Sequence, residues 1–364
     1  MKTEAAVLAE PGRRMSLETV LLEAPKAGEV LVRLLASGVC HSDLHVVEGH
    51  WKLPMPLVLG HEGAGVVEEV GPGVRDIAVG DHVVLSWFAP CRRCAYCVTG
   101  RAWACTTTRA DYCVMEDGTT RLRRLNGDTL FPFLAVGSFA RHAVVPESGA
   151  VVVPAAVPAA VAALIGCAVT TGVGAVLNTA RVPAGSSAAV IGCGGVGLSA
   201  VMGLRLAGAH PIVAVDLSAD RLAVATEVGA SHTVHGGEDV RDAVRAISDG
   251  GVDYAVEANG SPATVELAVR LLRRGGTAVL VGLPAAGVTA PLDHLSVVNL
   301  GKSIVGSAYG SSVPAVDFPR LAELYLAGRL PIDRLVTDRI VLEDVDGALE
   351  AMRRQQRVRS VVVY

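Results

Sequence analysis

The pattern of apolar and polar positions along the chain changes near Pro183. Before this residue, short apolar runs at 30–34, 63–74 and 80–84 alternate with turns rich in Gly and Pro. Runs of this length that are separated by turns, with no helical stretch between them, are typical of β-strands. We therefore predict a small, irregular, barrel-like β unit in the first part of the chain.

After residue 183, apolar runs alternate with segments of helical periodicity. Strands are predicted at 187–191, 211–215, 252–256 and 277–281, and helices at 196–206 and 221–228. Alternation of strand and helix at this spacing indicates a parallel, doubly wound sheet. The end of the chain leaves this pattern, with a predicted helix at 318–327 and an apolar strand at 360–364.

The composition indicates a folded protein of about two domains. Of the 364 residues, 51% are hydrophobic and 19% are charged, which is unlike a disordered chain. Only 4% are aromatic, so Val, Ala and Leu must fill most of the core. The net charge of −4, without a sustained basic run, argues against a nucleic-acid partner.

We expect a cytoplasmic protein without a membrane segment. Residues 1–10 lack the basic start and apolar stretch of a signal peptide. The most apolar segment, 151–176, contains Pro154, Pro158 and several Gly, so we expect it to be too interrupted for a membrane helix of roughly 20 residues. In a reducing compartment, clustered cysteines are more often metal ligands than disulfides.

Four of the eight cysteines are clustered: Cys91, Cys94, Cys97 and Cys105. The spacing Cys-x2-Cys-x2-Cys-x7-Cys suits one tetrahedral zinc, and four thiolates leave no open position, so the site is predicted to be structural. Buried reduced cysteines are the alternative, although they would not normally recur at every third residue. Taken alone, the loop is also compatible with a zinc ribbon that binds nucleic acid.

A glycine-rich turn lies between the predicted strand at 187–191 and the following helix. Gly192, Gly194 and Gly197 form a G-x-G-x-x-G pattern, and the next strand ends near Asp216. In this context the pattern predicts a dinucleotide site, in which the turn and the helix N-terminus hold the pyrophosphate. Asp216 favours NAD over NADP because its carboxylate would repel a 2′-phosphate, although Arg221 nearby weakens that preference.

Two further segments carry a family resemblance: Gly-Val-Cys-His-Ser-Asp at 38–43 and Gly-His-Glu-Gly-Ala-Gly-Val-Val at 60–67. Together with the four-cysteine loop and the glycine turn, they make the chain similar to zinc-containing medium-chain alcohol dehydrogenases over essentially its whole length. The resemblance includes the liver-type and thiol-dependent formaldehyde dehydrogenase branch and actinobacterial alcohol dehydrogenases. It implies an α/β protein with a GroES-like catalytic domain at 1–168 and 308–364, and a Rossmann NAD-binding domain at 169–307.

The resemblance also implies a second, catalytic zinc. Its ligands would be Cys40, His61 and Cys167, which leave one position for water or substrate oxygen. Asp43 would orient His61 from behind, and Glu62 would lie behind the metal and approach it transiently. Zinc with an open position lowers the pKa of an alcohol and polarises an aldehyde carbonyl, so the implied reaction is reversible, NAD-linked oxidation of primary alcohols to aldehydes.

The remaining roles come from the same resemblance. Ser42 and His45 would relay the proton to solvent. His41 stands where the family often has an arginine that pairs with the pyrophosphate, so a weaker cofactor grip is expected, and Arg359 would be the second pyrophosphate contact. Further expected cofactor contacts are Thr171 and Val196 at the nicotinamide, with Gly195 inside the glycine turn.

The substrate pocket is predicted to be apolar, with aromatic or long-chain alcohols as candidate substrates. By position, its lining residues would be Trp51, Trp87, Phe133 and Leu283. Arg109 stands where glutathione-dependent formaldehyde dehydrogenases carry an anion-binding arginine, whereas Trp51 replaces the acidic residue usual in that group. A thiol adduct of glutathione or mycothiol is therefore an alternative substrate.

Further alternatives concern the cofactor and the assembly. The chain also resembles nicotinoproteins, which keep NAD(H) bound, and biosynthetic reductases of the same family, in which Ser42 and His45 are often lost. Zinc-free reductases of this fold lack the cysteine ligands found here. The long segment 105–139 is typical of the dimeric branch, so a homodimer is expected.

Overall fold

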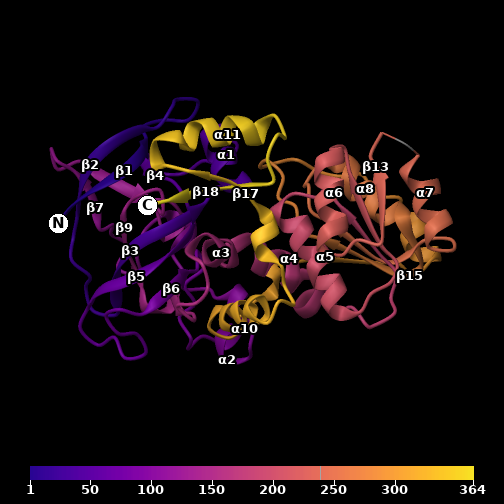
Figure 1. Cartoon of the computed structure of the whole chain (residues 1–364), viewed down its shortest axis with the longest axis horizontal. Helices are drawn as coiled ribbons and strands as arrows, with labels where there is room; N and C mark the ends of the chain where they lie inside the picture. Colours follow the sequence, from indigo (N-terminus) through magenta and orange to yellow (C-terminus); the bar gives the residue numbers. More distant parts are fainter. Residues whose placement is uncertain (238) are drawn as a thin grey trace. The chain divides into compact units, whose positions relative to one another are not determined.

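The computed structural model describes residues 1–237 and 239–364, without the side chain of Asp111. Contacts divide the chain into two compact units, which are Met1–Cys167 with Val313–Tyr364, and Ala168–Ser312 (Figure 1). The domain boundaries proposed from sequence, 168/169 and 307/308, lie close to this division. That the two parts are separate domains remains a prediction.

A closed barrel forms part of the first unit, as the turn-punctuated sequence predicted. Its strands, in spatial order, are β1 (Lys2–Leu8), β2 (Ser16–Leu22), β7 (Leu122–Arg124), β8 (Thr129–Pro132) and β4 (Leu57–Val58). The side chains of Val7, Val20 and Leu130 are fully buried inside it. β1 alternates buried and partly exposed positions near its start, the pattern of a strand with one face on a core.

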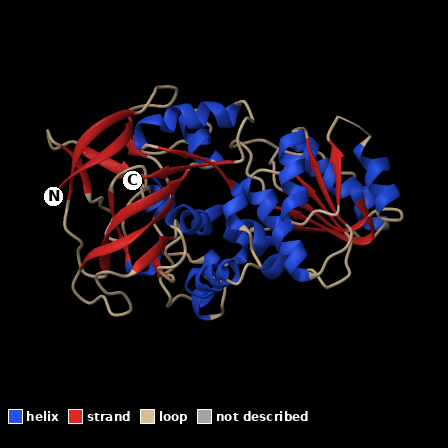
Figure 2. Ribbon diagram, viewed as in Figure 1, coloured by secondary structure: helices blue, strands red, loops and turns tan. Residues whose placement is uncertain are grey.

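The same unit contains a second, larger sheet (Figure 2). Its order is β10 (Ala150–Val152), β6 (His82–Leu85), β5 (Glu62–Val70), β3 (Glu29–Gly38), β18 (Arg359–Val363) and β17 (Val336–Ile340), with β9 (His142–Pro146) also paired to β3. β18 runs antiparallel to β3, with Val361 opposite Gly38. The C-terminal strand is thereby brought beside the strand that leads to Cys40.

Two strands in this sheet are shorter than the sequence predicted. β5 stops at Val70, not at residue 74, because Gly71 and Pro72 turn the chain and Pro72 has no N–H for the ladder. β6 begins at His82, not at residue 80, because the chain is still turning at Gly80, where φ is +96°.

Short helices complete the first unit. They are α1 (His41–Val47), α2 (Ala95–Val98), α3 (Ala159–Leu164), α10 (Pro314–Leu326) and α11 (Val345–Arg353), with 3-10 turns η1 (Ala102–Ala104), η2 (Ala110–Tyr112), η3 (Phe133–Ala135), η4 (Glu147–Gly149), η8 (Ile332–Leu335) and η9 (Leu342–Asp344). The predicted C-terminal helix is confirmed as α10, which begins earlier than expected, with Pro314 in its first turn, where a missing N–H costs nothing.

The segment 151–176 was expected to be interrupted by Pro154, Pro158 and several Gly. The prolines do precede the helix, which begins at Ala159, but the glycines do not interrupt it, so the expectation of a broken segment is wrong from that residue on. α3 continues through a π-helical stretch, η5 (Ile165–Val169), into α4 (Thr170–Gly174) and a second π-helical stretch, η6 (Ala175–Ala180). By length and composition, Ala159–Ala180 could cross a membrane, but 83% of its most apolar window is buried inside the protein. A buried, glycine-containing helix of this kind is a core helix, since Gly lets neighbouring backbones approach closely.

The second unit is the predicted doubly wound sheet. Its strands are all parallel, in the order β13 (His232–His235), β12 (Ile212–Asp216), β11 (Ala188–Ile191), β14 (Val252–Glu257), β15 (Leu272–Leu280) and β16 (Ser303–Gly306). β11 and β12 are buried at every position, as expected for strands covered on both faces.

Helices lie on both faces of this sheet (Figure 2). They are α5 (Gly195–Ala207), α6 (Ala219–Val228), α7 (Val240–Ile247), α8 (Pro262–Leu271) and α9 (His294–Asn299), with the 3-10 turn η7 (Ala308–Ser311). The strand order reverses at β11, so its carboxyl end is the switch point where such sheets bind ligands.

Candidate active site

Cys40 and His61 are held in place by one buried carboxylate. Cys40 is the residue that precedes α1, and Asp43 lies in the first turn of that helix with no exposed surface. Asp43 Oδ2 accepts the backbone N–H of Cys40 at 2.9 Å, and its Oδ1 accepts that of Gly60 at 3.1 Å. A single side chain therefore caps the helix and fixes the loop that carries His61.

The same carboxylate orients the imidazole of His61. Nδ1 of His61 lies 3.3 Å from Asp43 Oδ1, and the ring meets Phe133 edge-to-face with 5.3 Å between ring centroids. With the hydrogen on Nδ1 donated to the carboxylate, Nε2 keeps the lone pair that a metal requires. Asp43 thus has the contacts expected of a residue that positions a ligand.

Cys40, His61, Glu62 and Cys167 converge, with one ligand atom of each within 4.8 Å of the others. Cys167 comes from the π-helical stretch η5, a local geometry often found at functional sites. A hydrogen bond from the Cys167 thiol, aided by His61, lowers the pKa of Cys40 well below its ordinary value despite burial. Two sulfurs and one imidazole nitrogen are a donor set that fits zinc and leaves a position open.

Glu62 and Arg359 form a buried ion pair at the same place. Glu62 is fully buried and Arg359 is 4% exposed, and the guanidinium donates to Glu62 Oε2. Burial raises the pKa of Glu62 to about 7 against the opposing effect of Arg359. Within the described residues, Glu62 Oε1 and Arg359 Nε have no hydrogen-bond partner, so each retains capacity for a bound group. The pyrophosphate role of Arg359 remains a prediction.

The four-cysteine loop brings its sulfur atoms together as predicted. The Sγ atoms of Cys91 and Cys97, and those of Cys94 and Cys105, lie 4.0 Å apart. Sulfurs bound tetrahedrally to one zinc at about 2.3 Å are separated by about 3.8 Å, so the loop fits this metal with little adjustment. Backbone N–H groups of Cys94 and Cys91 also point at Cys91 Sγ and Cys105 Sγ, both at 3.3 Å.

The glycine turn has the geometry of a dinucleotide site. Gly192 has φ +91°, and a Cβ on Gly197 would lie 1.7 Å from the Gly192 carbonyl oxygen, so both positions require glycine for the turn itself. A Cβ on Gly194 would meet nothing within 4 Å, so the protein alone does not require glycine there. Open space at the start of α5 is what the close approach of a pyrophosphate needs.

Asp216 lies at the carboxyl end of β12, beside this turn. Its Oδ2 accepts the backbone N–H of Cys193 at 2.6 Å, and its Oδ1 accepts that of Ser218 at 2.9 Å. Arg221 follows in the first turn of α6, where its backbone N–H donates to Ser218. Thr171 and Val196 are half-buried on the packed helices α4 and α5, and Gly195 is buried at the start of α5.

Comparison with known proteins decides the family. Residues 26–155 match the alcohol dehydrogenase GroES-like domain, and residues 195–327 match the zinc-binding dehydrogenase family. An S-(hydroxymethyl)glutathione dehydrogenase of Paracoccus denitrificans is 36% identical, with 100% of both chains covered. The chain belongs to the zinc-containing alcohol dehydrogenase family.

Two solved structures agree with this assignment. The alcohol dehydrogenase zinc-binding domain protein of Burkholderia ambifaria is 42% identical, with a TM-score of 0.94. The benzyl alcohol dehydrogenase of Acinetobacter calcoaceticus is 35% identical, also with a TM-score of 0.94. Each comparison covers 100% of this chain and 99% of the other. The protein is therefore a zinc- and NAD-dependent dehydrogenase, and its four-cysteine loop lies inside the matched catalytic region, which argues against a nucleic-acid-binding ribbon.

The predicted relay residues of the dehydrogenase lie on α1. Ser42 is half-buried in the first turn, and His45 follows one turn later. His45 Nδ1 lies 3.0 Å from His50 Nδ1, and its ring centroid is 4.9 Å from that of the exposed His41. The relay remains a prediction, as does the pyrophosphate role of His41.

The four predicted pocket residues of the dehydrogenase lie in different surroundings. Trp87 lines a pocket, whereas Phe133 is fully buried against His61. Trp51 packs on the core with its ring 5.1 Å from that of His45, and Leu283 is 61% exposed in the second unit. The structure thus brings only one of the four into that pocket.

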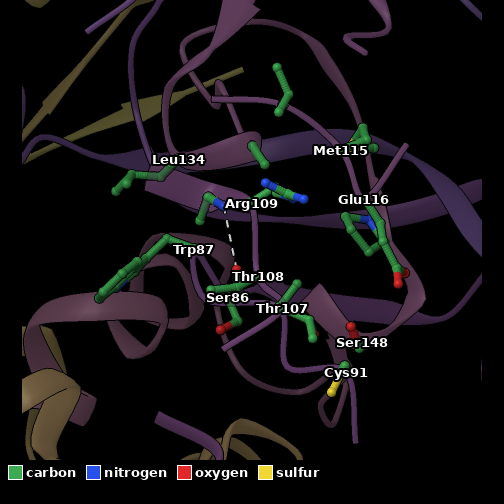
Figure 3. A pocket seen from close by; sticks show the side chains of 15 residues that line it. Ser86, Trp87, Cys91, Thr107, Thr108, Arg109, Met115, Glu116, Leu134 and Ser148 are labelled. Carbon is green, nitrogen blue, oxygen red and sulfur yellow. Dashed lines mark hydrogen bonds between the residues drawn. The ribbon is translucent and has the colours of Figure 1, made fainter. Parts of the chain in front are cut away.

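Other side chains complete the pocket around Trp87 (Figure 3). Leu134 lies on the same side as Trp87, and Arg109 projects between them and Met115 and Glu116. Leu134 was missed because the family resemblance pointed by position to its neighbour Phe133. No sequence signal was available, because the side chain that faces the pocket depends on the backbone at Leu134, where φ is +53°, a value that a leucine does not indicate in advance.

Proposed function

We propose that this dehydrogenase catalyses the NAD-linked, reversible oxidation of primary alcohols, aromatic or long-chain, to aldehydes. The observation that carries the choice of substrate is Phe133, whose ring packs edge-to-face on His61 at the predicted catalytic zinc site. The pocket beside Trp87 has none of the three predicted zinc ligands among its lining residues. An aromatic side chain beside the predicted zinc ligands favours an apolar substrate body. The similarity to a benzyl alcohol dehydrogenase supports the same substrate class.

Each residue of the predicted site would have its own role in this reaction. Zinc held by Cys40, His61 and Cys167 would supply Lewis-acid chemistry at the substrate oxygen. Asp43 would keep His61 in the correct tautomer, and Ser42 with His45 would carry the proton from the site to solvent. The presence of both relay residues favours alcohol–aldehyde chemistry over a biosynthetic reductase role.

A second candidate function is oxidation of a thiol adduct of formaldehyde. Arg109 lines the same pocket as Trp87 and is exposed, so its guanidinium could pair with a carboxylate of glutathione or mycothiol. The relative from Paracoccus denitrificans, which is named for S-(hydroxymethyl)glutathione, supports this alternative. Trp51 weakens it because the thiol-dependent group usually has an acidic residue at that position.

An NAD-coupled screen separates the two candidates. Benzyl alcohol, octanol and ethanol are compared with formaldehyde in the presence and absence of glutathione or mycothiol. Activity on benzyl alcohol and octanol without thiol supports the proposal, whereas activity confined to formaldehyde with a thiol contradicts it. Arg109→Gln should reduce only the thiol-dependent reaction, and Arg101→Gln, another exposed arginine of the cysteine loop, is the matched control.

Cofactor exchange and assembly can be checked on the same preparation. Absorbance at the NADH band of the freshly purified protein would favour a nicotinoprotein, and recovery without this band supports ordinary exchange. We propose a cytoplasmic homodimer on the basis of the long segment 105–139. Light scattering should then give twice the mass of one chain.

A further inference from the structure

Three side chains at the end of α1 form a third group of potential metal ligands, composed of other residues than the two predicted zinc sites. His45, Glu48 and His50 each place one ligand atom within 4.8 Å of the others. The group shares no residue with the Cys40 cluster or with the four-cysteine loop. His50 and Glu48 are accessible to solvent, with 42% and 26% of their side-chain surface exposed, so an ion could reach them.

The backbone at the end of α1 pairs the two histidines. The N–H of His50 donates to the carbonyl of His45 at 2.9 Å, and the N–H of Gly49 donates to that of Val46 at 3.0 Å, with Gly49 at φ +74°. These bonds form a Schellman motif, which places the side chain two residues beyond the cap against one in the last turn. That contact is usually apolar, whereas here both side chains are imidazoles.

The distances match those between neighbouring ligands of one ion. His45 Nδ1 and His50 Nδ1 are 3.0 Å apart. Two nitrogens that bind the same zinc at about 2.0–2.1 Å are about 2.8–3.4 Å apart, when the nitrogen–metal–nitrogen angle lies between the octahedral and the tetrahedral value. Glu48 Oε2 lies 3.6 Å from His50 Nδ1, and Arg353 Nε fixes the other oxygen of that carboxylate at 2.9 Å. The third ligand is thereby oriented.

We propose that His45, Glu48 and His50 bind a divalent transition-metal ion, preferentially Zn²⁺, and that its binding slows turnover. Two imidazoles and one carboxylate suit Zn²⁺ rather than Mg²⁺ or Ca²⁺, which prefer oxygen ligands. The ion takes the place of the hydrogen shared by the two Nδ1 atoms, and that proton leaves to solvent. The effect on turnover rests on the proposed relay, because an ion on His45 prevents that imidazole from passing a proton.

Binding is measured independently of activity. Protein already carrying two zinc ions per chain is dialysed against increasing Zn²⁺, and the bound metal is counted. A third equivalent is expected, and His50→Gln or Glu48→Gln should weaken it at least tenfold, since even indirect metal partners typically contribute 10–100-fold. His232→Gln, which removes another exposed histidine, should retain it. If His50→Gln still binds a third equivalent of zinc, the proposed site is wrong.

The effect on turnover is then tested with the same proteins. Added Zn²⁺ should slow alcohol oxidation by the wild type and by His232→Gln, whereas Glu48→Gln, which leaves His45 and His50 in place, should keep its basal rate and lose the inhibition. If the third ion binds without inhibiting the enzyme, the proposed effect on turnover is wrong, whereas the binding site found by dialysis still stands. Absence of dehydrogenase activity before zinc is added contradicts the proposed function instead, so the two failures are distinguishable.

Discussion

At the scale of single residues, Asp43 has the most consequential contacts. Its carboxylate accepts two backbone N–H groups and meets His61, so one side chain positions two predicted zinc ligands. The resemblance implied that Asp43 orients His61, and the structure shows this contact together with a hydrogen bond from the backbone N–H of Cys40. Burial gives these hydrogen bonds their strength, because water cannot compete for them.

We predict that Asp43→Asn weakens the catalytic zinc by about 10–100-fold, because the amide cannot hold His61 Nδ1–H and two backbone donors equally well. The measurement is zinc content after dialysis against a graded chelator. Asp81→Asn, which alters a carboxylate that caps an exposed turn, should leave both zinc ions in place. Equal zinc retention in the two variants would contradict the prediction.

His41 offers a test of the cofactor grip. It is exposed beside Cys40, and an imidazole, unlike a guanidinium, carries no permanent positive charge. His41→Arg places a permanent charge there and should tighten NADH binding, with slower cofactor release. Fluorescence titration with NADH checks this, and His232→Arg is the control for added charge. An unchanged dissociation constant for His41→Arg would refute the role.

At the scale of elements, local sequence determined the glycine turn, the cysteine loop and the strand ends at Gly71 and Gly80, and tertiary contacts tie the strands to one another. The turn after β11 forms because Gly192 and Gly197 tolerate geometries closed to other residues. β14 is also tied to the start of β11, since Asp253 accepts the N–H and hydroxyl of Ser187 at 2.8 and 2.9 Å and pairs with Arg273.

This link predicts a pH-dependent contribution to stability. Burial alone would raise the pKa of Asp253, but the hydrogen bonds from Arg273 and Ser187 outweigh it and lower the pKa below the ordinary value. A carboxyl whose pKa is lower in the folded state stabilises the protein above its unfolded pKa, and loses this effect as the pH falls through its folded pKa. Asp253→Asn should therefore lower the melting temperature at pH 7, by about 2–4 °C for each kcal/mol lost.

The same variant should approach wild-type stability as the pH falls below about 4, the ordinary pKa of aspartate. Thermal melts across this range measure the difference, and Asp249→Asn is the control. A constant difference at all pH values would mean that the side chain acts through shape rather than charge.

At the scale of the whole molecule, the two predicted zinc ions should respond differently to loss of a ligand. Cys105→Ser should leave one zinc per chain and destabilise residues 91–105, because a structural zinc contributes directly to folding. Metal analysis and amide hydrogen exchange in that loop are the measurements. Cys193→Ala, a cysteine outside both clusters, should retain both ions, and two ions in Cys105→Ser would exclude the assignment.

The sequence by itself determined the fold class, the parallel sheet, the glycine turn and the four-cysteine loop. These features depend on periodicity and on residues close together in the chain, so local patterns carry them. The family resemblance implied that Cys167 meets Cys40, and the structure brings the two together. Only the tertiary structure decided that Arg359 pairs with Glu62 and that Leu134, rather than Phe133, shares a pocket with Trp87. Contacts between residues far apart in the sequence depend on how strands pair and on the direction in which each side chain leaves the backbone. Neither is determined by the neighbouring residues in the sequence.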